Sequence, residues 1–211
     1  MDERAQEVLD LWFPDNGHWE TMERHKAFWN ERMQGGMDDT IIRNYAGLTE
    51  AGARGELDDW ADTPRGRLAL LIVLDQFPRS LWRETPAAFG QDCKATRLAL
   101  EGIRIGHYDA LQETWEREFY HIALSHCEGP DHLERMDLCV SLVGRHGEVV
   151  RDTLGHVPEM SLQQANRVRD VIRRFGRHPH RNPIYGRVSS PEEEAYIATG
   201  DFPHVNTVAN T

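Results

Sequence analysis

The stretch that decides the fold is TPRGRLALLIVLDQFPR, residues 63–79, the most apolar helical segment of this 211-residue chain. Four of its residues recur at i, i+3, i+4 and i+7, the spacing of one face of an α-helix: Leu68, Leu71, Ile72 and Asp75. Thr63 can cap the start of the helix, and Pro64 suits its first turn because the N–H that proline lacks would stay unbonded there. The stretch therefore predicts a helix that begins at Thr63 and packs into the core.

The end of this helix carries polar groups beside its apolar face. Asp75 lies on that face, so we expect its carboxylate at the margin of the core. Arg79 follows four residues later, within reach of an ion pair. Pro78 disfavours α geometry at Phe77, so we expect the helix to kink or end there and to free backbone carbonyls. An Asp–Arg pair that holds a buried helix end, helped by Gln76, is the structural explanation of this segment.

Helical periodicity continues along nearly the whole chain, and almost no segment alternates like a strand. We expect further helices over residues 2–13, 21–33, 38–54, 85–106, 113–126, 131–146 and 161–175, and a short one that begins at Ser190-Pro191. Gly176 stands where a C-cap glycine is expected. About nine helices with short connections predict an all-α domain of packed antiparallel helical hairpins. No shift in composition divides the chain, so we expect one domain over residues 1–205 and a frayed tail over 206–211.

The composition narrows the classes of function. Hydrophobic residues make up 39% and charged residues 28%, as in soluble globular proteins. The net charge of −11 repels phosphate backbones and anionic membranes, so we expect neither a nucleic-acid nor a membrane partner. No run approaches the roughly 20 apolar residues of a membrane-spanning helix, and no signal peptide is evident. The three cysteines include no C-x-x-C pair, so we expect a cytoplasmic protein without disulfides or a zinc knuckle.

A basic segment lies near the C-terminus of the sequence. Seven arginines and one acid, Asp170, lie between Arg167 and Arg187, a net charge of +6. Guanidinium groups suit the bidentate capture of carboxylate or phosphate. Pairing of Arg173 and Arg174 with Asp170 on a solvated helix face explains part of this pattern.

Familiar catalytic motifs are absent from the sequence: it has no G-x-S-x-G, no Walker loop, no G-x-G-x-x-G and no H-E-x-x-H. His178 and His180 flank a proline, but such a pair lacks the further ligands of a metal site, so we expect no metal. The run Ser125-His126-Cys127-Glu128 offers a base, a nucleophile or a ligand. Neighbouring helix residues point in different directions, so we expect no Cys127–His126 dyad; a buried His–Glu hydrogen bond is the structural alternative.

Together these segments resemble the motif series of the bacterial domain-of-unknown-function family 924. That family reads L-D-Q-F-P-R-N, then H-S-E, then R-F-G-R-F-P-H-R-N, then G-R-x-S-T-x-E-E. The chain has corresponding residues in the same order and spacing at 74–80, 126–128, 174–182 and 186–193, and the resemblance runs from Val8 to Glu193. It implies an all-α fold similar to tetratricopeptide-repeat proteins, and it brings no established activity.

Three positions depart from the motifs of that family. Ser80 stands in place of Asn, Cys127 in place of Ser, and His178 in place of Phe. The last departure leaves His180 as the histidine that the motif supplies, which weakens the idea of a metal held by both imidazoles. Cys127 keeps a small polar side chain where the family has Ser, which argues against a required thiol.

Our first hypothesis is a small-molecule site, catalytic or not, that binds a carboxylate or phosphate without a cofactor or metal. If the fold brings the three polar segments together, the ligand-binding residues are Asp75, Gln76, Arg79, Arg174, Arg177, Arg181 and Asn182. The candidate catalytic residues are His126, Glu128 and His180, with imidazole as acid or base and carboxylate to orient it. Whether the protein is an enzyme stays open.

The alternative is a helical scaffold that binds a peptide or protein, in which the polar motifs are purely structural. Six tryptophans suit interface anchors, and an exposed aromatic groove away from the motifs would favour it. A third hypothesis, metal-independent RNA cleavage by Arg174 and His180, conflicts with the charge of −11. We favour the small-molecule site because residues 177–183 follow a helix in a loop, where functional residues gather.

Overall fold

The segment from Gly66 to Pro78 is buried without interruption in the structure, a computed structural model that describes residues 1–149 and 157–203. Helix α5 (Pro64–Leu71) begins as predicted, because the Thr63 hydroxyl accepts a 3.1 Å hydrogen bond from the Gly66 N–H. The helix then widens into a π-helical turn, η4 (Ile72–Gln76), and continues as α6 (Phe77–Leu81). Helices α1, α7 and α8 pack against α5, which places the predicted helix in the core.

The helix neither ends nor leaves α geometry at Phe77, contrary to the sequence prediction. Phe77 has φ −62° and ψ −38°, and its N–H donates to the Ile72 carbonyl five residues earlier. This wider turn accommodates Pro78, which has no N–H and whose ring would crowd a regular α turn. The Arg79 guanidinium donates to the Asp75 carbonyl, so the expected free carbonyl exists and is used.

The other helices confirm the all-α class, since residues 1–149 and 157–203 contain no strand. They are α1 (Glu3–Trp12), α2 (Met22–Glu31), α3 (Asp38–Asn44), α4 (Ala46–Arg54), α7 (Asp92–Arg104), α8 (Thr114–His126), α9 (His132–Val149), α10 (Val157–Phe175), α11 (Asn182–Tyr185) and α12 (Pro191–Ala198). Short 3-10 or π turns lie between them: η1 (His18–Glu20), η2 (Arg32–Gly36), η3 (Asp58–Asp62), η5 (Pro86–Phe89) and η6 (Pro179–Arg181). None of the helices within the described ranges is both long enough and apolar enough to cross a membrane.

Two predicted helices are divided, and one short helix was not predicted. Tyr45, at φ −122°, separates α3 from α4 within residues 38–54. The segment 85–106 contains the short turn η5 before α7 begins. Helix α11 has only four residues, too few for a periodic pattern to show. The frayed tail expected over 206–211 lies outside the described residues.

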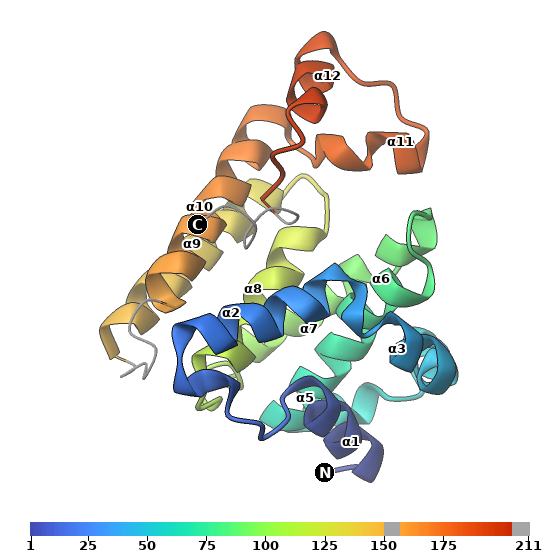
Figure 1. Cartoon of the computed structure of the whole chain (residues 1–211), viewed down its shortest axis with the longest axis vertical. Helices are drawn as coiled ribbons and strands as arrows, with labels where there is room; N and C mark the ends of the chain where they lie inside the picture. The colour runs from blue at the N-terminus through green and yellow to red at the C-terminus, as the bar shows by residue number, and fades with distance from the viewer. Residues whose placement is uncertain (150–156, 204–211) are drawn as a thin grey trace.

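Packed helices place the C-terminal segment over one end of the molecule. Helices α9 and α10 run antiparallel, side by side, as the hairpin prediction requires (Figure 1). Gly176 ends α10 with φ +69°, the left-handed geometry expected of a C-cap glycine. Helices α11 and α12 then form the end of the structure opposite α1 and α5 (Figure 1). This return brings residues 178–187 to the C-terminal end of α8.

Close packing at the start of α5 leads to a stability prediction. A Cβ added to Gly66 would lie 2.2 Å from the Trp60 carbonyl oxygen, a backbone atom that cannot move away cheaply. We expect Gly66→Ala to lower the free energy of unfolding by about 1–3 kcal/mol, measured by chemical denaturation. Gly144 in α9 is the matched control, because no atom of the described residues outside the backbone of its own helix lies within 4 Å of its added Cβ. Gly144→Ala should raise the stability by about 0.5–1 kcal/mol, and equal effects of the two substitutions would contradict this packing.

Candidate functional site

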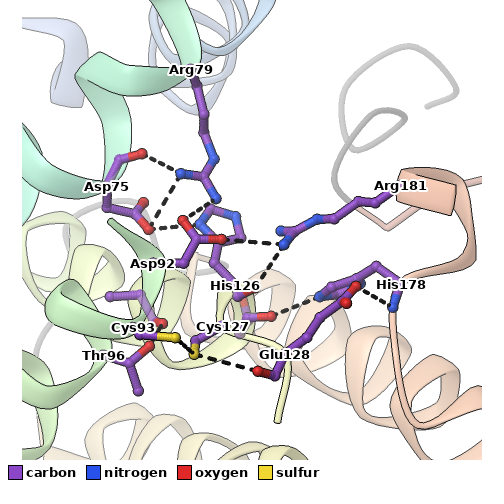
Figure 2. Close-up of polar contacts among 12 residues, drawn as sticks. Asp75, Arg79, Asp92, Cys93, Thr96, His126, Cys127, Glu128, His178 and Arg181 are labelled. Atoms are coloured by element: carbon purple, nitrogen blue, oxygen red, sulfur yellow. Dashed lines mark hydrogen bonds and ion pairs between the residues drawn. The ribbon is translucent and has the colours of Figure 1, made fainter. Parts of the chain in front are cut away.

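Three segments that are distant in the sequence meet at the C-terminal end of α8 (Figure 2). His126, the last residue of α8, shares a 2.8 Å hydrogen bond between its Nδ1 and the Asp75 carboxylate. Asp92 binds two guanidinium groups, Arg79 at 2.9 Å and Arg181 at 3.2 Å. Arg181 also donates to the His126 carbonyl at 2.8 Å. The fold thus brings together the polar groups of all three predicted motifs.

Asp92 is the member of this cluster that the sequence analysis missed. It is the first residue of α7, and its side chain is only 5% exposed. Each of its carboxylate oxygens faces one guanidinium group, so it joins Arg79 to Arg181. An acid in the first turn of a helix is common and stabilises the helix dipole, so nothing in the pattern marked Asp92 as part of a site.

Asp75 and His126 form a buried hydrogen-bonded pair in which both groups have a shifted pKa. Burial raises the pKa of Asp75, while Arg79 and the Gln76 amide oppose this by stabilising its charge. Burial and the neighbouring Arg79 hold the pKa of His126 well below its usual range, so the imidazole is neutral near pH 7. With its Nδ1–H directed at a carboxylate, the basic nitrogen of the ring is Nε2.

A cavity of about 510 Å³, here called the central cavity, lies beside this cluster. Its charged lining residues are four arginines, Arg32, Arg79, Arg83 and Arg181, and two glutamates, Glu84 and Glu118. His121, His126 and His180 also line it. Its apolar wall includes Trp12, Phe89, Ile122, Met136, Ala165, Val168 and Ile184. Asp75 and Asp92 are not part of the lining, so the buried carboxylates lie behind the guanidinium groups that face the cavity.

Two hydrogen-bond donors among the residues that line the central cavity have no acidic partner in the described part of the chain. Arg32 makes no ion pair with any described carboxylate; its guanidinium donates to the Leu11 and Trp12 carbonyls at 3.2 and 3.4 Å. Burial lowers the pKa of Arg32. The buried Nε1–H of Trp12 has no hydrogen-bond partner among the described residues. Arg32 could therefore bind a polar atom of a ligand without giving up an existing acidic partner, whereas the Trp12 nitrogen is fully buried.

Other predicted residues hold the segment after α10 in place. Glu128 accepts the His178 backbone N–H at 2.9 Å and pairs with the Arg187 guanidinium. Asn182 donates to the Ser189 hydroxyl at 2.9 Å. His180 lines the central cavity, and burial lowers its pKa to about 4. Glu128 and Asn182 therefore support the site from outside the cavity lining, whereas His180 lies in it.

Two predicted binding residues lie apart from the cluster. The side chain of Arg174 is 51% exposed and pairs with Glu192 at 2.7 Å. Arg177 pairs with Glu193 at 2.7 Å, and Glu193 also completes the capping box with Ser190 at the start of α12. These contacts join α12 to the end of α10, and neither arginine lines the central cavity.

Further polar side chains bind the backbone carbonyl groups at the end of α8. Arg135 donates to the Leu124 and Cys127 carbonyls, each at 2.7 Å. His132 and His178 both bond to the Ser125 carbonyl, at 2.9 and 2.8 Å. A helix end leaves such carbonyls unbonded, and burying them without partners would cost stability. Arg135, His132 and His178 thus satisfy carbonyl groups at the end of α8, and of these three only His178 belongs to the motif series.

One group of side chains in the described residues has the spacing of a metal site. The potential ligand atoms of Asp75, Asp92 and His126 all lie within 4.8 Å of one another. Arg79 and Arg181 already neutralise these carboxylates, and a metal ion would lie close to both positive groups. The two guanidinium groups therefore oppose a cation between the carboxylates.

Comparison with known proteins gives a family and a structural relative. Residues 8–201 match the family model described as a bacterial protein of unknown function (DUF924). The solved structure of ATU0120, a protein of unknown function from Agrobacterium tumefaciens, is similar, with a TM-score of 0.70 and 30% sequence identity. The similarity covers 94% of this chain and 98% of that one. No curated protein matches this sequence.

Proposed function

We propose, for a chain that belongs to the bacterial family of unknown function DUF924, that the central cavity binds a small anionic molecule. The ligand carries a carboxylate or phosphate group and an apolar portion. The observation that carries this proposal is the orientation of the buried ion pairs, in which Arg79 and Arg181 face the cavity and Asp75 and Asp92 lie behind them.

The charge of the lining supports an anion. Four arginines and two glutamates line the central cavity, whereas the whole chain has a net charge of −11. Buried carboxylates hold Arg79 and Arg181 in place, so little side-chain entropy is lost when a ligand binds. Arg32 adds a guanidinium that is half-buried and outside any ion pair with the described acids.

The volume and the apolar wall support a ligand larger than an inorganic ion. About 510 Å³ lies within the range of small-molecule sites, which are mostly apolar with a few placed polar groups. The Trp12 indole and the side chains from α9 and α10 offer such a wall.

Within this site we assign His126 the role of acid–base group. It lines the cavity, Asp75 orients it, and its lowered pKa leaves it neutral and able to accept a proton near pH 7. His180 is the second imidazole of the lining. Glu128 acts as a positioning residue, because it holds the His178 N–H and with it the loop that carries Arg181.

The two other hypotheses find less support. A peptide-binding scaffold was expected to show an exposed aromatic groove, but all six tryptophans are buried or half-buried. For RNA cleavage, Arg174 would have to act with His180, yet Arg174 is exposed beside Glu192 while His180 lines the central cavity.

A thermal-shift screen tests the proposal. The probes are inorganic phosphate, phosphate monoesters, mono- and dicarboxylates and nucleotides, each compared with chloride at equal ionic strength. A ligand at about 100 times its Kd stabilises the folded state by about 2.7 kcal/mol, so we expect one class to raise Tm by roughly 5 °C or more. No shift beyond chloride with any class would contradict the proposal.

Two variants place the binding in the central cavity. Arg32→Gln removes a lining charge without separating an ion pair, and Ala165→Met reduces the volume without changing charge. We expect both to raise the apparent Kd at least about tenfold and so to reduce the ligand-induced shift. Arg32→Gln does so because a lost charged contact is worth on the order of 1.5–3 kcal/mol, and Ala165→Met does so because its longer side chain occupies space that the ligand needs. Arg43→Gln, in an exposed pair with Asp39, is the control that should keep the full shift. An equal loss in all three variants would show binding elsewhere.

A further inference from the structure

A pair of thiols lies next to Asp92 and His126, two members of the ion-pair cluster. The sulfur atoms of Cys93 and Cys127 are 2.8 Å apart (Figure 2). Cys93 is the second residue of α7, and Cys127 follows the last residue of α8. The sequence predicted no disulfide, because its three cysteines are odd in number and include no C-x-x-C pair. Packing of α7 against α8 brings them together.

We propose that Cys93 and Cys127 form a reversible intramolecular disulfide when the chain meets a hydroperoxide. Disulfides of this kind in reducing compartments are transient and serve redox sensing or catalysis. A bond requires the sulfur atoms to close from 2.8 Å to about 2.05 Å, a movement of less than one ångström. The inference does not depend on the proposed function of the central cavity.

The two thiols differ in a way that assigns their roles. Both cysteines line a second cavity of about 400 Å³, together with Arg181 and Arg187, but Cys93 is the exposed one. Cys127 is buried, and burial with the hydrogen bond to Cys93 raises the pKa of its thiol to about 12. Cys127 therefore keeps its proton, and its S–H donates to the Glu128 carbonyl oxygen at 3.6 Å. Cys93 is the accessible group that reacts first, and Cys127 is the resolving thiol.

The reaction balances in two steps. The Cys93 sulfur attacks the terminal oxygen of the hydroperoxide, the O–O bond breaks, and the products are a sulfenic acid on Cys93 and an alcohol, or water if the oxidant is hydrogen peroxide. The Cys127 sulfur then attacks the Cys93 sulfur and loses its proton, the S–O bond breaks, and water leaves. In total two thiols are oxidised by two electrons, and one hydroperoxide is reduced.

The bond would connect the two helix ends that carry the ion-pair cluster. Asp92 directly precedes Cys93, and His126 directly precedes Cys127. Oxidation would thus join the start of α7 to the end of α8 between the residues that bind Arg181.

Thiol mapping tests the inference on the full chain. One equivalent of hydrogen peroxide is added, free thiols are alkylated in denaturant, and the protein is examined by intact mass and peptide mapping. We expect the free thiols to fall from three to one, with Cys139 alkylated and Cys93 linked to Cys127, and dithiothreitol to restore all three. Three remaining thiols, a sulfinic acid on Cys93, or a bridge to Cys139 would overturn the inference.

Matched variants and a denatured control complete the test. Cys93→Ser and Cys127→Ser should form no bridge, and Cys139→Ser should form it as the wild type does. Serine at position 127 matches the motif that the sequence resembles, so we expect that variant to fold. In denaturing guanidinium chloride the bridge should form at least about tenfold more slowly, because the fold no longer provides the high effective concentration. An equal rate in the folded and denatured chains would overturn the role of the fold.

Discussion

Arg181→Ala should lower the free energy of unfolding by about 3–5 kcal/mol, the usual cost of removing one partner of a buried ion pair. Arg181 is 3% exposed. It binds Asp92 at 3.2 Å and the His126 carbonyl at 2.8 Å, and its guanidinium lies 4.4 Å from the centre of the Phe89 ring. In the variant, the buried Asp92 carboxylate keeps only Arg79 as a partner, and the buried His126 carbonyl loses the hydrogen bond that Arg181 donates. In a chain of this length, Tm should fall by roughly 6–20 °C.

Arg174→Ala is the control for this prediction. Arg174 carries the same charge and also pairs with an acid, but its side chain and that of Glu192 are 51% and 62% exposed. Exposed ion pairs contribute at most about 1 kcal/mol, so its Tm should change little. Urea denaturation and thermal scans of the two variants give the comparison. A loss below about 1 kcal/mol for Arg181→Ala would show that the buried cluster is not assembled as described.

A double-mutant cycle attributes the effect to the Arg181–Asp92 contact. Asp92→Asn should also destabilise the protein, because both Arg79 and Arg181 lose their shared carboxylate. The double variant should be more stable than the sum of the two single losses predicts, by roughly 0.5–3 kcal/mol. Additive losses would mean that Arg181 acts mainly through the His126 carbonyl.

Acid should destabilise the protein steeply between pH 6.5 and about 4. Four buried or half-buried histidines have a pKa lowered to about 4, with burial as the largest cause: His18, His25, His132 and His180. In the unfolded chain the pKa of each is about 6.5. As the pH falls, the unfolded chain therefore takes up protons before the folded protein does. The stability contributed by neutral histidines is complete above pH 6.5 and is lost as the pH falls toward 4.

The expected effect is large because several groups act together. One such histidine lowers the free energy of unfolding by up to about 1.4 kcal/mol per pH unit within this window. Burial is the largest cause of the low pKa values of His18 and His25. Their Nδ1 atoms also share one hydrogen bond at 3.0 Å, which protonation of both rings would break. Between pH 6.5 and 5 we expect a loss of several kcal/mol out of the 5–15 kcal/mol typical of a folded domain.

Urea denaturation at a series of pH values measures this slope, and histidine NMR assigns it. The slope should correspond to at least two protons taken up on unfolding, and the rings of His18 and His25 should stay neutral at pH 5.5. Stability that is constant from pH 7 to pH 5 would contradict the prediction. Carboxylates with a lowered pKa, such as Glu128, lose their contribution only at lower pH and so do not produce this slope.

The positions of the helices were predicted well, because hydrophobic periodicity and capping residues depend only on neighbours in the sequence. Thr63 and Pro64 begin α5, and Gly176 ends α10, as capping chemistry requires. The same rules could not place the π-helical turn before Pro78, because a proline inside a buried helix can be accommodated in several ways and tertiary packing selects one. Nor could they divide residues 38–54 at Tyr45, where no glycine or proline marks the break.

The site was predictable only as a set of polar segments. Asp75, Arg79, His126 and Arg181 do meet, but the residue that joins the two arginines is Asp92, which has no distinctive sequence neighbours. Arg174 and Arg177 come from the densest part of the basic segment and instead pair with Glu192 and Glu193. Charge density along a chain does not show which arginines a fold turns inward, since that depends on long-range contacts.

The π-helical turn Ile72–Gln76 determines how this helix tolerates the deletion of a residue. Such a turn holds one residue more than an α turn, and each residue rotates an α-helix by about 100°. Deleting one residue between Leu71 and Gln76 would remove the wide turn and force Pro78 into a regular α turn, where its ring would crowd the carbonyl group four residues earlier. The segment should therefore accept the exchange of one apolar residue for another of similar size far more readily than the loss of any single position, and a deletion scan should find this helix the least tolerant part of the chain.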